Sequence, residues 1–391
     1  MSMSDPDRPA RPWVVFSDDW GRHPSSCQHL IRPLLPHRPV LWVNTIGTRP
    51  PRFDWTTARR IAEKLKGWMR SKSRPDSDSG LSPAVLSPKM WPSFKSRPAR
   101  WLNRRLLLRA LRPAIAAMEE PPCIVTTLPL VADLAGEFPG ARWAYYCVDD
   151  FSAWPGYDGA TMQRMERELV PKIDVAIAVS ETLQRHLAGL GRSSHLLTHG
   201  VDLEHWRSGS EESLPELAEF EGPLVVFWGV VDRRMDVAFV RALSNAMTAG
   251  TILLVGPQDN PEPELLKLPR VRWKPPWPFE KLPALARAAG VLVMPYGDMP
   301  ATRAMQPLKL KEYLATGRPA VLRDLPATRD WADAADVVGT QDAFAEAVLR
   351  RLATGTPPEQ LQARQRLDTE GWAAKAKQFE CWVDGVERRA D

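Results

Sequence analysis

Short runs of apolar and β-branched residues alternate with stretches of helical periodicity along most of the chain. Such runs, bounded by turn-forming residues, predict buried strands, and the stretches between them predict amphipathic helices. The first half contains the predicted strands WVVF, PVLWVN, CIVTT, RWAYYCV, DVAIAVS and SHLLT. The second half contains LVVFWG, TILLVG, VRW, VLVMPY, PAVL and DVVG. Two such series predict an α/β protein with two doubly wound domains on parallel sheets.

Periodicity is lost between Gly200 and Pro223, where turn-forming and acidic residues replace it. We therefore assign residues 1–200 to a first Rossmann-like domain and residues 201–365 to a second. Residues 366–391 are predicted to form a C-terminal helix that packs back toward the first domain. Ligands of open parallel sheets bind beyond the carboxyl ends of the strands, so two such domains that face each other predict a ligand cleft between them.

The composition is that of a globular protein, with 391 residues, 44% of them hydrophobic and 25% charged. This length suits two domains of roughly 100–200 residues each. No apolar run approaches the roughly 20 residues of a membrane-spanning helix, and the first residues lack the apolar core of a signal peptide, so we expect a cytoplasmic protein. The cysteines have no metal-ligand spacing and are expected to be reduced. They are Cys27, Cys123, Cys147 and Cys381.

The net charge of +5 is unevenly distributed. Residues 49–112 carry 17 Lys and Arg against four acids, an excess of 13 positive charges. Within them, FDWTTARRIAEKLKGWMR and ARWLNRRLLLRALRPAIAAM have the composition of helices that lie on an anionic membrane surface. The Ser- and Pro-rich sequence between them predicts a loop or a partly disordered excursion. The alternative is two helices that cover a sheet and expose solvated basic faces. Nucleic acid is not the expected partner, because no recognition motif accompanies the charge.

Ordered sequence blocks resemble those of a known enzyme family. The blocks are DVAIAVSETLQRHL, HLLTHGVDLEHW, VVFWGVVDRRMD, LLVGP, VRWKPPWPFEKLPALARAAGVLVMPY and PLKLKEYLATGRPAV. Over most of Asp174 to Asp324, their order resembles that of the group 1 retaining glycosyltransferases. FSDDWGRHPSSCQHL and YYCVDDFSAWPG further resemble a bacterial subgroup that builds cell-surface polysaccharides. The resemblance implies the GT-B architecture of two facing Rossmann-like domains, with an acceptor-binding first domain and a second domain for a UDP- or GDP-sugar donor.

The resemblance also implies which residues bind the donor. Glu312 matches the family acid that accepts hydrogen bonds from the ribose hydroxyls, although an acid in the first turn of a helix is an alternative. Lys309 and Arg234 match cations that offset the charge growing on the departing diphosphate. The remaining candidates are glycines beside the donor and an aromatic residue beside the base, each with an ordinary turn or a packed ring as its alternative. They are Gly200, Gly229 and Trp277, with Phe279 as a second aromatic choice.

One position departs from the family pattern. The family usually places two acids eight positions apart, and the position eight before Glu312 is Ala304. The first acid of the family contacts the sugar, so the resemblance does not identify the donor sugar. The Pro-x-Lys pattern before the retained acid fits the bacterial subgroup, and Thr302, Arg303 and Gln306 become the candidates for sugar contacts.

Acidic residues follow predicted strands in the first domain. CVDDF places Asp149 and Asp150 at a strand end, where adjacent side chains point in opposite directions. One is therefore expected to face the substrate while the other caps the loop. We favour Asp149 as the catalytic or acceptor-orienting residue, with two turn acids as the alternative. The sequence SDDWGRH supplies weaker acceptor candidates, Asp18, Asp19 and His23.

The sequence as a whole predicts a glycosyltransferase that moves a sugar from a nucleotide diphosphate to a glycan or lipid-linked acceptor in cell-surface polysaccharide synthesis. Retention is implied by the resemblance, and metal-independent transfer without a cofactor is expected because no His or Cys cluster has metal-ligand spacing. The basic segment predicts peripheral attachment at the inner face of the cell membrane. Two alternatives remain: a nucleotide-sugar epimerase on the same architecture, and a non-catalytic membrane-associated relative, which Ala304 favours and the KLKE and DRRMD blocks oppose.

Overall fold

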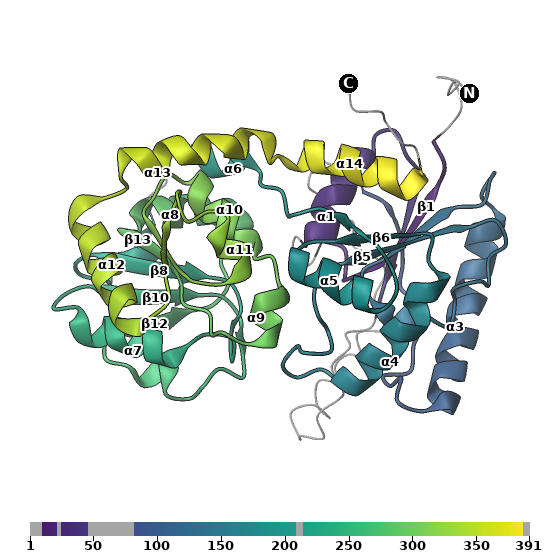
Figure 1. Cartoon of the computed structure of the whole chain (residues 1–391), viewed down its shortest axis with the longest axis horizontal. Helices are drawn as coiled ribbons and strands as arrows, with labels where there is room; N and C mark the ends of the chain where they lie inside the picture. Colours follow the sequence, from purple (N-terminus) through teal and green to yellow (C-terminus); the bar gives the residue numbers. More distant parts are fainter. Residues whose placement is uncertain (1–9, 22–24, 46–81, 209–213, 386–391) are drawn as a thin grey trace. The chain divides into compact units, whose positions relative to one another are not determined.

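The computed structural model describes residues 10–21, 25–45, 82–208 and 214–385. The first predicted basic helix, which contains Trp55 and Trp68, and the acceptor candidate His23 lie outside these ranges. The chain divides into two compact units (Figure 1). Unit 1 comprises Met1–Val179, Leu183–Leu197 and Ala376–Asp391, and unit 2 comprises Ser180–Thr182 and Thr198–Lys375.

Unit 1 is built on a seven-stranded parallel sheet with the strand order β3-β2-β1-β4-β5-β6-β7. Its strands are β1 (Trp13–Ser17), β2 (Val40–Asn44), β3 (Ala84–Leu86), β4 (Cys123–Thr126), β5 (Arg142–Cys147), β6 (Val175–Ala178) and β7 (His195–Leu196). Its helices are α1 (Ser26–Ile31), α3 (Arg97–Ala116), α4 (Gly159–Leu169), most of α5 (Glu181–Gly189) and most of α14 (Trp372–Asp384). Right-handed crossovers place α3, α4 and α5 on one face, opposite α1 and α14 (Figure 1).

The structure confirms all six strands predicted for the first half of the chain. They are recognisable in the sequence because parallel strands that are covered on both faces form continuous apolar runs. All five residues of β1 and all four of β4 are buried. One prediction is wrong: the Ser- and Pro-rich sequence between the two basic segments is not only loop, since it contains the edge strand β3, paired with β2. Its three residues, Ala-Val-Leu, are apolar, but two of them are exposed and serines and prolines surround them, so the short run does not stand out as a strand.

Helix α14 is anchored to unit 1 by ion pairs between the buried Arg38 and two partly exposed acids. The guanidinium of Arg38 pairs with Glu380 at 2.8 Å and with Asp384 at 2.5 Å. The indole N–H of Trp13 donates to Asp384 at 2.9 Å, and the ring of Phe379 contacts that of Trp13 at 5.8 Å. These contacts pack the C-terminal part of α14 against unit 1.

Unit 2 contains a six-stranded parallel sheet with the order β12-β10-β8-β13-β14-β15. Its strands are β8 (Leu224–Trp228), β10 (Thr251–Val255), β12 (Val271–Lys274), β13 (Val291–Met294), β14 (Ala320–Arg323) and β15 (Asp336–Val338), beside a small pair of β9 (Val231–Asp232) and β11 (Gln258–Asp259). Its helices are α6 (Leu203–Arg207), α7 (Val237–Ala246), α8 (Leu282–Ala288), α9 (Pro300–Ala304), α10 (Leu308–Ala315), α11 (Pro326–Arg329), α12 (Gln341–Thr354) and α13 (Pro358–Ala363). All six strands predicted for the second half are confirmed.

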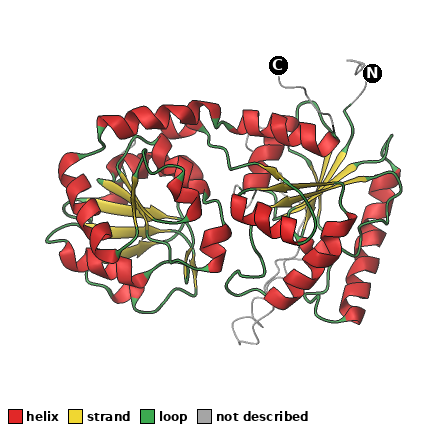
Figure 2. Cartoon of the chain, viewed as in Figure 1, coloured by secondary structure: helices red, strands yellow, loops and turns green. Residues whose placement is uncertain are grey.

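Both sheets lie between layers of helices (Figure 2). Short 3₁₀ turns connect several of the elements: η1 (Arg32–Leu34), η2 (Pro129–Val131), η3 (Val170–Lys172), η4 (Pro215–Leu217), η5 (Leu265–Lys267), η6 (Phe279–Lys281) and η7 (Arg364–Thr369). Within the described residues, no helix combines the length and apolarity needed to cross a membrane.

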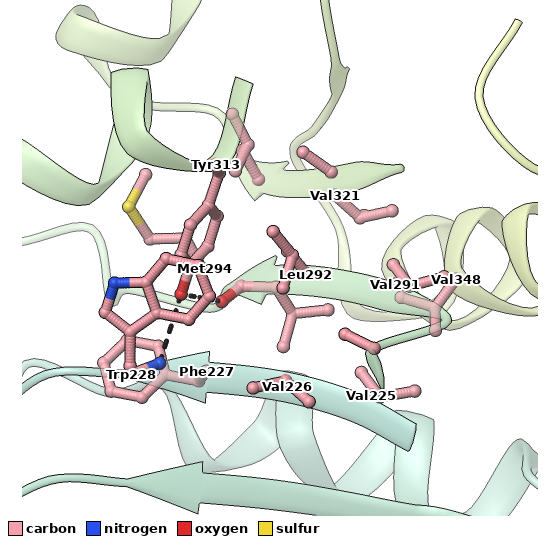
Figure 3. Packing of buried hydrophobic residues seen from close by; sticks show 14 of the residues in the cluster. Val225, Val226, Phe227, Trp228, Val291, Leu292, Met294, Tyr313, Val321 and Val348 are labelled. Atoms are coloured by element: carbon pink, nitrogen blue, oxygen red, sulfur yellow. Dashed lines mark hydrogen bonds between the residues drawn. The ribbon is translucent and has the colours of Figure 1, made fainter. Parts of the chain in front are cut away.

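The strand order of unit 2 reverses between β8 and β13. From β8 the chain continues to β10 and β12 on one side, and from β13 it continues to β14 and β15 on the other. In doubly wound sheets ligands bind outside the carboxyl ends of the strands at this switch point. Strand β8 ends at Trp228 and β13 ends at Met294, both packed in the core around Tyr313 (Figure 3). The residues that follow these two strands are therefore the first place to look for a site.

Candidate functional site

Lys309 places a positive charge at the switch point. Its ammonium donates to the hydroxyl of Tyr296 and lies 4.8 Å from the ring centroid of Phe227 and 5.0 Å from that of Tyr296. Among the described residues, no carboxylate lies within ion-pair distance of it. Charges removed from water are normally paired. A half-buried ammonium held by a phenol and two ring faces is thus poised to bind an anionic ligand.

Two glycines keep side chains out of the space beside Lys309. Gly229 follows β8 with φ of +126°, and a Cβ atom there would lie 2.7 Å from Nζ of Lys309. Gly256 follows β10 with φ of +150°, and its Cβ would lie 1.9 Å from the carbonyl oxygen of Gly229. Any larger residue at either position would strain the backbone and displace the lysine or the neighbouring strand end.

Glu312 is held one turn further along α10. The indole N–H of Trp228 donates to its Oε2 at 3.1 Å, and no described residue donates to its Oε1. Burial raises the pKa of Glu312, whereas the Trp228 hydrogen bond and the charge of Lys309 act in the opposite direction. The carboxylate is therefore fixed in position with one oxygen still able to accept hydrogen bonds from a ligand.

Aromatic packing fixes the residues around Glu312. The ring of Trp228 stacks on that of Trp206 at 5.3 Å and meets the edge of Tyr313 at 4.4 Å. The hydroxyl of Tyr313 accepts from the backbone N–H of Trp228 and donates to the carbonyl of Val293, both at 3.3 Å (Figure 3). Helix α10 is thereby tied to the ends of both strands at the switch point.

Arg234 lies on the other side of Tyr296. Its Nε donates to both carboxylate oxygens of Asp232 at 3.0 Å, and its Cζ lies 5.6 Å from the ring centroid of Tyr296. The two cations predicted for the diphosphate therefore meet around one tyrosine, but the charge of Arg234 is offset by Asp232 and that of Lys309 is not. Sequence reasoning missed Tyr296 and Trp228, whose only signal was an aromatic residue at the end of a predicted strand.

The other donor-side candidates have structural neighbours of their own. A Cβ atom at Gly200 would lie 2.8 Å from the ring of Trp372, so this glycine permits close packing against the start of α14. Trp277 is half-buried against the core of unit 2. Phe279 stacks on His205 at 4.0 Å with the rings nearly parallel. Donor contacts at these positions stay predictions.

The three sugar-contact candidates differ in how their polar groups are used. The hydroxyl of Thr302 accepts from the backbone N–H of Met299 at 3.1 Å and donates to a carbonyl, as a helix cap does. Arg303 is exposed and pairs with Asp298. Gln306 is 7% exposed, and its amide has no hydrogen-bond partner among the described residues. Ala304, where the family has its first acid, is fully buried between them.

The acceptor-side candidates follow β1 and β5 in unit 1, two strands apart at the carboxyl edge of one sheet. The carboxylate of Asp18 accepts from Ser17, Ser25 and Gln28 within 2.9 Å, which fixes the loop after β1. That of Asp150 accepts from the backbone N–H and the hydroxyl of Ser152, which caps the loop after β5.

Asp149 and Asp19 complete the described acceptor-side candidates. Asp149 directly follows Val148 at the end of β5 and is partly exposed, and Asp19 is exposed. In the part of the chain that the structure describes, no group of three or more His, Cys, Asp and Glu side chains is placed to hold a metal ion.

No protein-family model matches the chain. Among curated proteins, it is 25% identical to TuaH of Bacillus subtilis, provisionally described as a teichuronic acid biosynthesis glycosyltransferase. That match spans 239 residues, 57% of this chain and 60% of TuaH.

Solved structures with the same fold cover nearly the whole chain. Sucrose-phosphate synthase from Thermosynechococcus elongatus superimposes with a TM-score of 0.70 at 17% identity, over 96% of this chain and 99% of its own. HepE from Anabaena, solved with UDP and glucose, superimposes with a TM-score of 0.66 at 11% identity, over 96% of this chain and 100% of HepE. The trehalose 6-phosphate synthase of Burkholderia multivorans superimposes with a TM-score of 0.65 at 13% identity, over 96% of this chain and 98% of its own. The chain has the GT-B fold of these proteins, with two parallel-sheet Rossmann-like domains.

Proposed function

We propose that this protein is a glycosyltransferase that moves a sugar from a nucleotide diphosphate donor to a hydroxyl of a glycan or lipid-linked acceptor in cell-surface polysaccharide synthesis. The observation that carries the proposal is Lys309, an ammonium without an anionic partner among the described residues, placed beside Gly229 and one turn from Glu312 at the switch point of unit 2. The similarity to TuaH and to HepE solved with UDP supports this assignment.

Each group at this site has a task in the transfer. The bond between the sugar C1 and the terminal phosphate oxygen breaks, C1 bonds to the acceptor oxygen, and the acceptor proton passes to the departing phosphate. Lys309, with Arg234, offsets the negative charge that grows on the diphosphate, so the transfer needs no metal ion. Glu312 accepts from the ribose hydroxyls through the oxygen that Trp228 does not occupy, in the manner of a charge-assisted pair.

The sugar and the acceptor are assigned to the remaining candidates. The amide of Gln306 offers both a donor and an acceptor to the sugar hydroxyls. Asp149 orients the acceptor hydroxyl, and departure of phosphate from the face that the acceptor enters retains the configuration at C1. The acceptor is lipid-linked at the inner face of the cell membrane, to which the protein attaches peripherally.

Calorimetric titration with UDP, GDP and their sugar conjugates tests the proposal. At least one nucleotide should bind, and Glu312→Ala should weaken that binding about tenfold or more, because a lost charge-assisted hydrogen bond costs about 1.5–3 kcal/mol. Glu346→Ala, at an exposed position on α12, is the matched control and should bind as the wild type does. If every nucleotide fails to bind, unit 2 is not a donor site. If Glu312→Ala binds normally, Glu312 does not contact the ribose and is only an acid in the first turns of its helix.

Product analysis separates the proposal from its alternatives. With a labelled donor and a lipid-linked acceptor fraction, transfer releases free nucleoside diphosphate and labels the lipid. An epimerase would convert the donor sugar into its isomer without labelling the lipid. A non-catalytic relative, which Ala304 favours, would bind nucleotide and consume none.

A further inference from the structure

Only some of the arginines on helix α3 form ion pairs with other residues of the protein. Leu107, Leu108 and Leu111 are buried, so the apolar side of the helix covers the sheet and is not available to lipid. Arg100 pairs with Asp133 and Glu168 on the same side of the unit. Arg104 and Arg112 both reach Glu137. These three arginines hold the helix in place.

The outward side of α3 carries exposed arginines without ion pairs among the described residues. Arg97, Arg105 and Arg109 are exposed, and none of them lies within ion-pair distance of a carboxylate in the described ranges. They share this side with Trp101, which is 57% exposed. The guanidinium of Arg105 lies 5.5 Å from the ring centroid of Trp101. A spacing of four residues keeps such side chains on one stripe of a helix.

A second exposed indole is held against the same helix. The amide of Asn103, only 1% exposed, accepts from the backbone N–H of Trp91 at 2.6 Å and donates to the carbonyls of Trp91 and Ser93 at 3.1 Å. Met90 and Phe94 are buried on either side. The Trp91 side chain nevertheless remains 53% exposed. The local packing therefore fixes the backbone and presents the ring to solvent. Because residues two apart on a helix point in nearly opposite directions, Asn103 anchors Trp91 away from the stripe that holds Trp101.

We propose that the outward face of α3, defined as Arg97, Trp101, Arg105 and Arg109, is the surface by which the protein docks on an anionic lipid bilayer. Indole rings are favoured at the level of the headgroups, and arginines are attracted by anionic lipids. Because the leucines face inward, the contact is shallow: the charges and the indole of Trp101 reach the headgroups while the helix stays packed on its sheet. The proposal rests on the proposed function, whose lipid-linked acceptor lies at this surface.

Nucleic acid is the less favoured partner for this face. Its arginines form one short stripe on a helix whose neighbouring arginines are already paired, and no base-recognition motif accompanies them. Exposed tryptophans stack on single-stranded bases as well, so competition between the two ligands belongs in the test.

Co-sedimentation with vesicles of phosphatidylcholine, with and without phosphatidylglycerol, measures the docking. The full chain should bind the anionic vesicles and bind less as salt is raised. Each arginine near an anionic surface contributes about fivefold to the partition coefficient, so Arg97→Gln, Arg105→Gln and Arg109→Gln together should lower it about a hundredfold. Trp101→Ala should lower it as well. Residues 46–81 stay unchanged in both variants.

A matched control removes the same number of charges from exposed positions in unit 2. Lys267→Gln, Arg272→Gln and Arg350→Gln together should leave the partition coefficient near the wild-type value. Equal binding to neutral and anionic vesicles, normal binding by the α3 variant, or displacement of the vesicles by single-stranded RNA would overturn the proposal. Nucleotide titration of the α3 variant, which should match the wild type, tells failure of this surface from failure of the donor site.

Discussion

Replacing Tyr296 by phenylalanine removes one oxygen atom from the centre of the candidate donor site. That oxygen accepts the hydrogen bond of the Lys309 ammonium. The ring itself remains, so the contacts of Tyr296 with Arg234 at 5.6 Å and with Phe227 at 6.0 Å are kept. The change therefore tests whether the hydroxyl positions the lysine, with little disturbance of the surrounding core.

The expected loss follows from the kind of bond removed. A hydrogen bond with one charged partner contributes about 1.5–3 kcal/mol, which corresponds to about ten- to a hundredfold in an equilibrium or rate constant. Lys309→Met removes the charge itself and should cost at least as much. If Tyr296 acts through Lys309, then Tyr296→Phe should have little further effect in the Lys309→Met background, and a double-mutant cycle should give a coupling of similar size.

The cycle is measured as the affinity for the nucleoside diphosphate that the wild type binds, and as donor turnover once an acceptor is known. Tyr145→Phe serves as the matched control, because it also removes a buried hydroxyl, one that donates to Glu166 at 2.8 Å in unit 1. Additive effects of the two substitutions, or wild-type affinity and turnover in Tyr296→Phe, would refute the positioning role.

Three further outcomes are expected. Gln306→Ala should reduce discrimination between donor sugars while the affinity for the free nucleoside diphosphate stays unchanged. A competition assay with sugar nucleotides measures this discrimination, and wild-type discrimination in the variant would contradict the prediction. Burial lowers the pKa of Lys311 to about 8, against 10.5 for an exposed lysine, so between these values the unfolded chain binds more protons and the contribution of Lys311 to stability rises with pH. The free energy of unfolding of wild type minus that of Lys311→Met, measured by denaturant titration, should therefore increase from pH 7.5 to 9.5, and a flat difference would contradict the argument. Arg38→Met leaves Glu380 and Asp384 without their buried cation, and calorimetry should show unit 1 destabilised by about 3–5 kcal/mol, whereas a loss below about 1 kcal/mol would mean that the α14 anchor is not electrostatic.

The sequence predicts the fold well because both sheets are parallel and covered on both faces. Strands such as β1 and β8 are buried at every residue, so each reads as an unbroken apolar run. The edge strand β3 is an apolar run of only three residues, mostly exposed and set among serines and prolines, so its pairing with β2 rather than its own pattern identifies it. Edge strands of three residues are decided by tertiary contacts, which a local pattern does not contain.

The candidate site is predictable only where chain position decides it. Lys309 and Glu312 fall on one side of a helix by spacing alone, and both lie at the switch point. The contact of Lys309 with Tyr296 joins two segments thirteen residues apart across a loop of irregular sequence. Likewise, Trp228 reaches Glu312 from 84 positions away. Such contacts depend on how two strands and a helix pack. The sequence therefore identifies the residues but does not show which of them are in contact.

A repeat in the sequence distinguishes the three sugar-contact candidates from one another. Asp-x-Pro-Ala-Thr-Arg occurs at 298–303, after β13, and again at 324–329, after the neighbouring strand β14. In both copies the threonine hydroxyl accepts from the backbone N–H three residues earlier, at 3.1 and 3.0 Å, and the arginine pairs with the aspartate.

Because the same contacts recur one strand further from the switch point, the turn from strand to helix explains the polar groups of Thr302 and Arg303. Gln306 has no such explanation, since the equivalent position in the second copy is Ala332. The amide of Gln306 has no hydrogen-bond partner among the described residues and is not enclosed away from solvent. A ligand can therefore pair with it, which makes Gln306 the side chain best placed to bind the sugar where the family acid is replaced by Ala304.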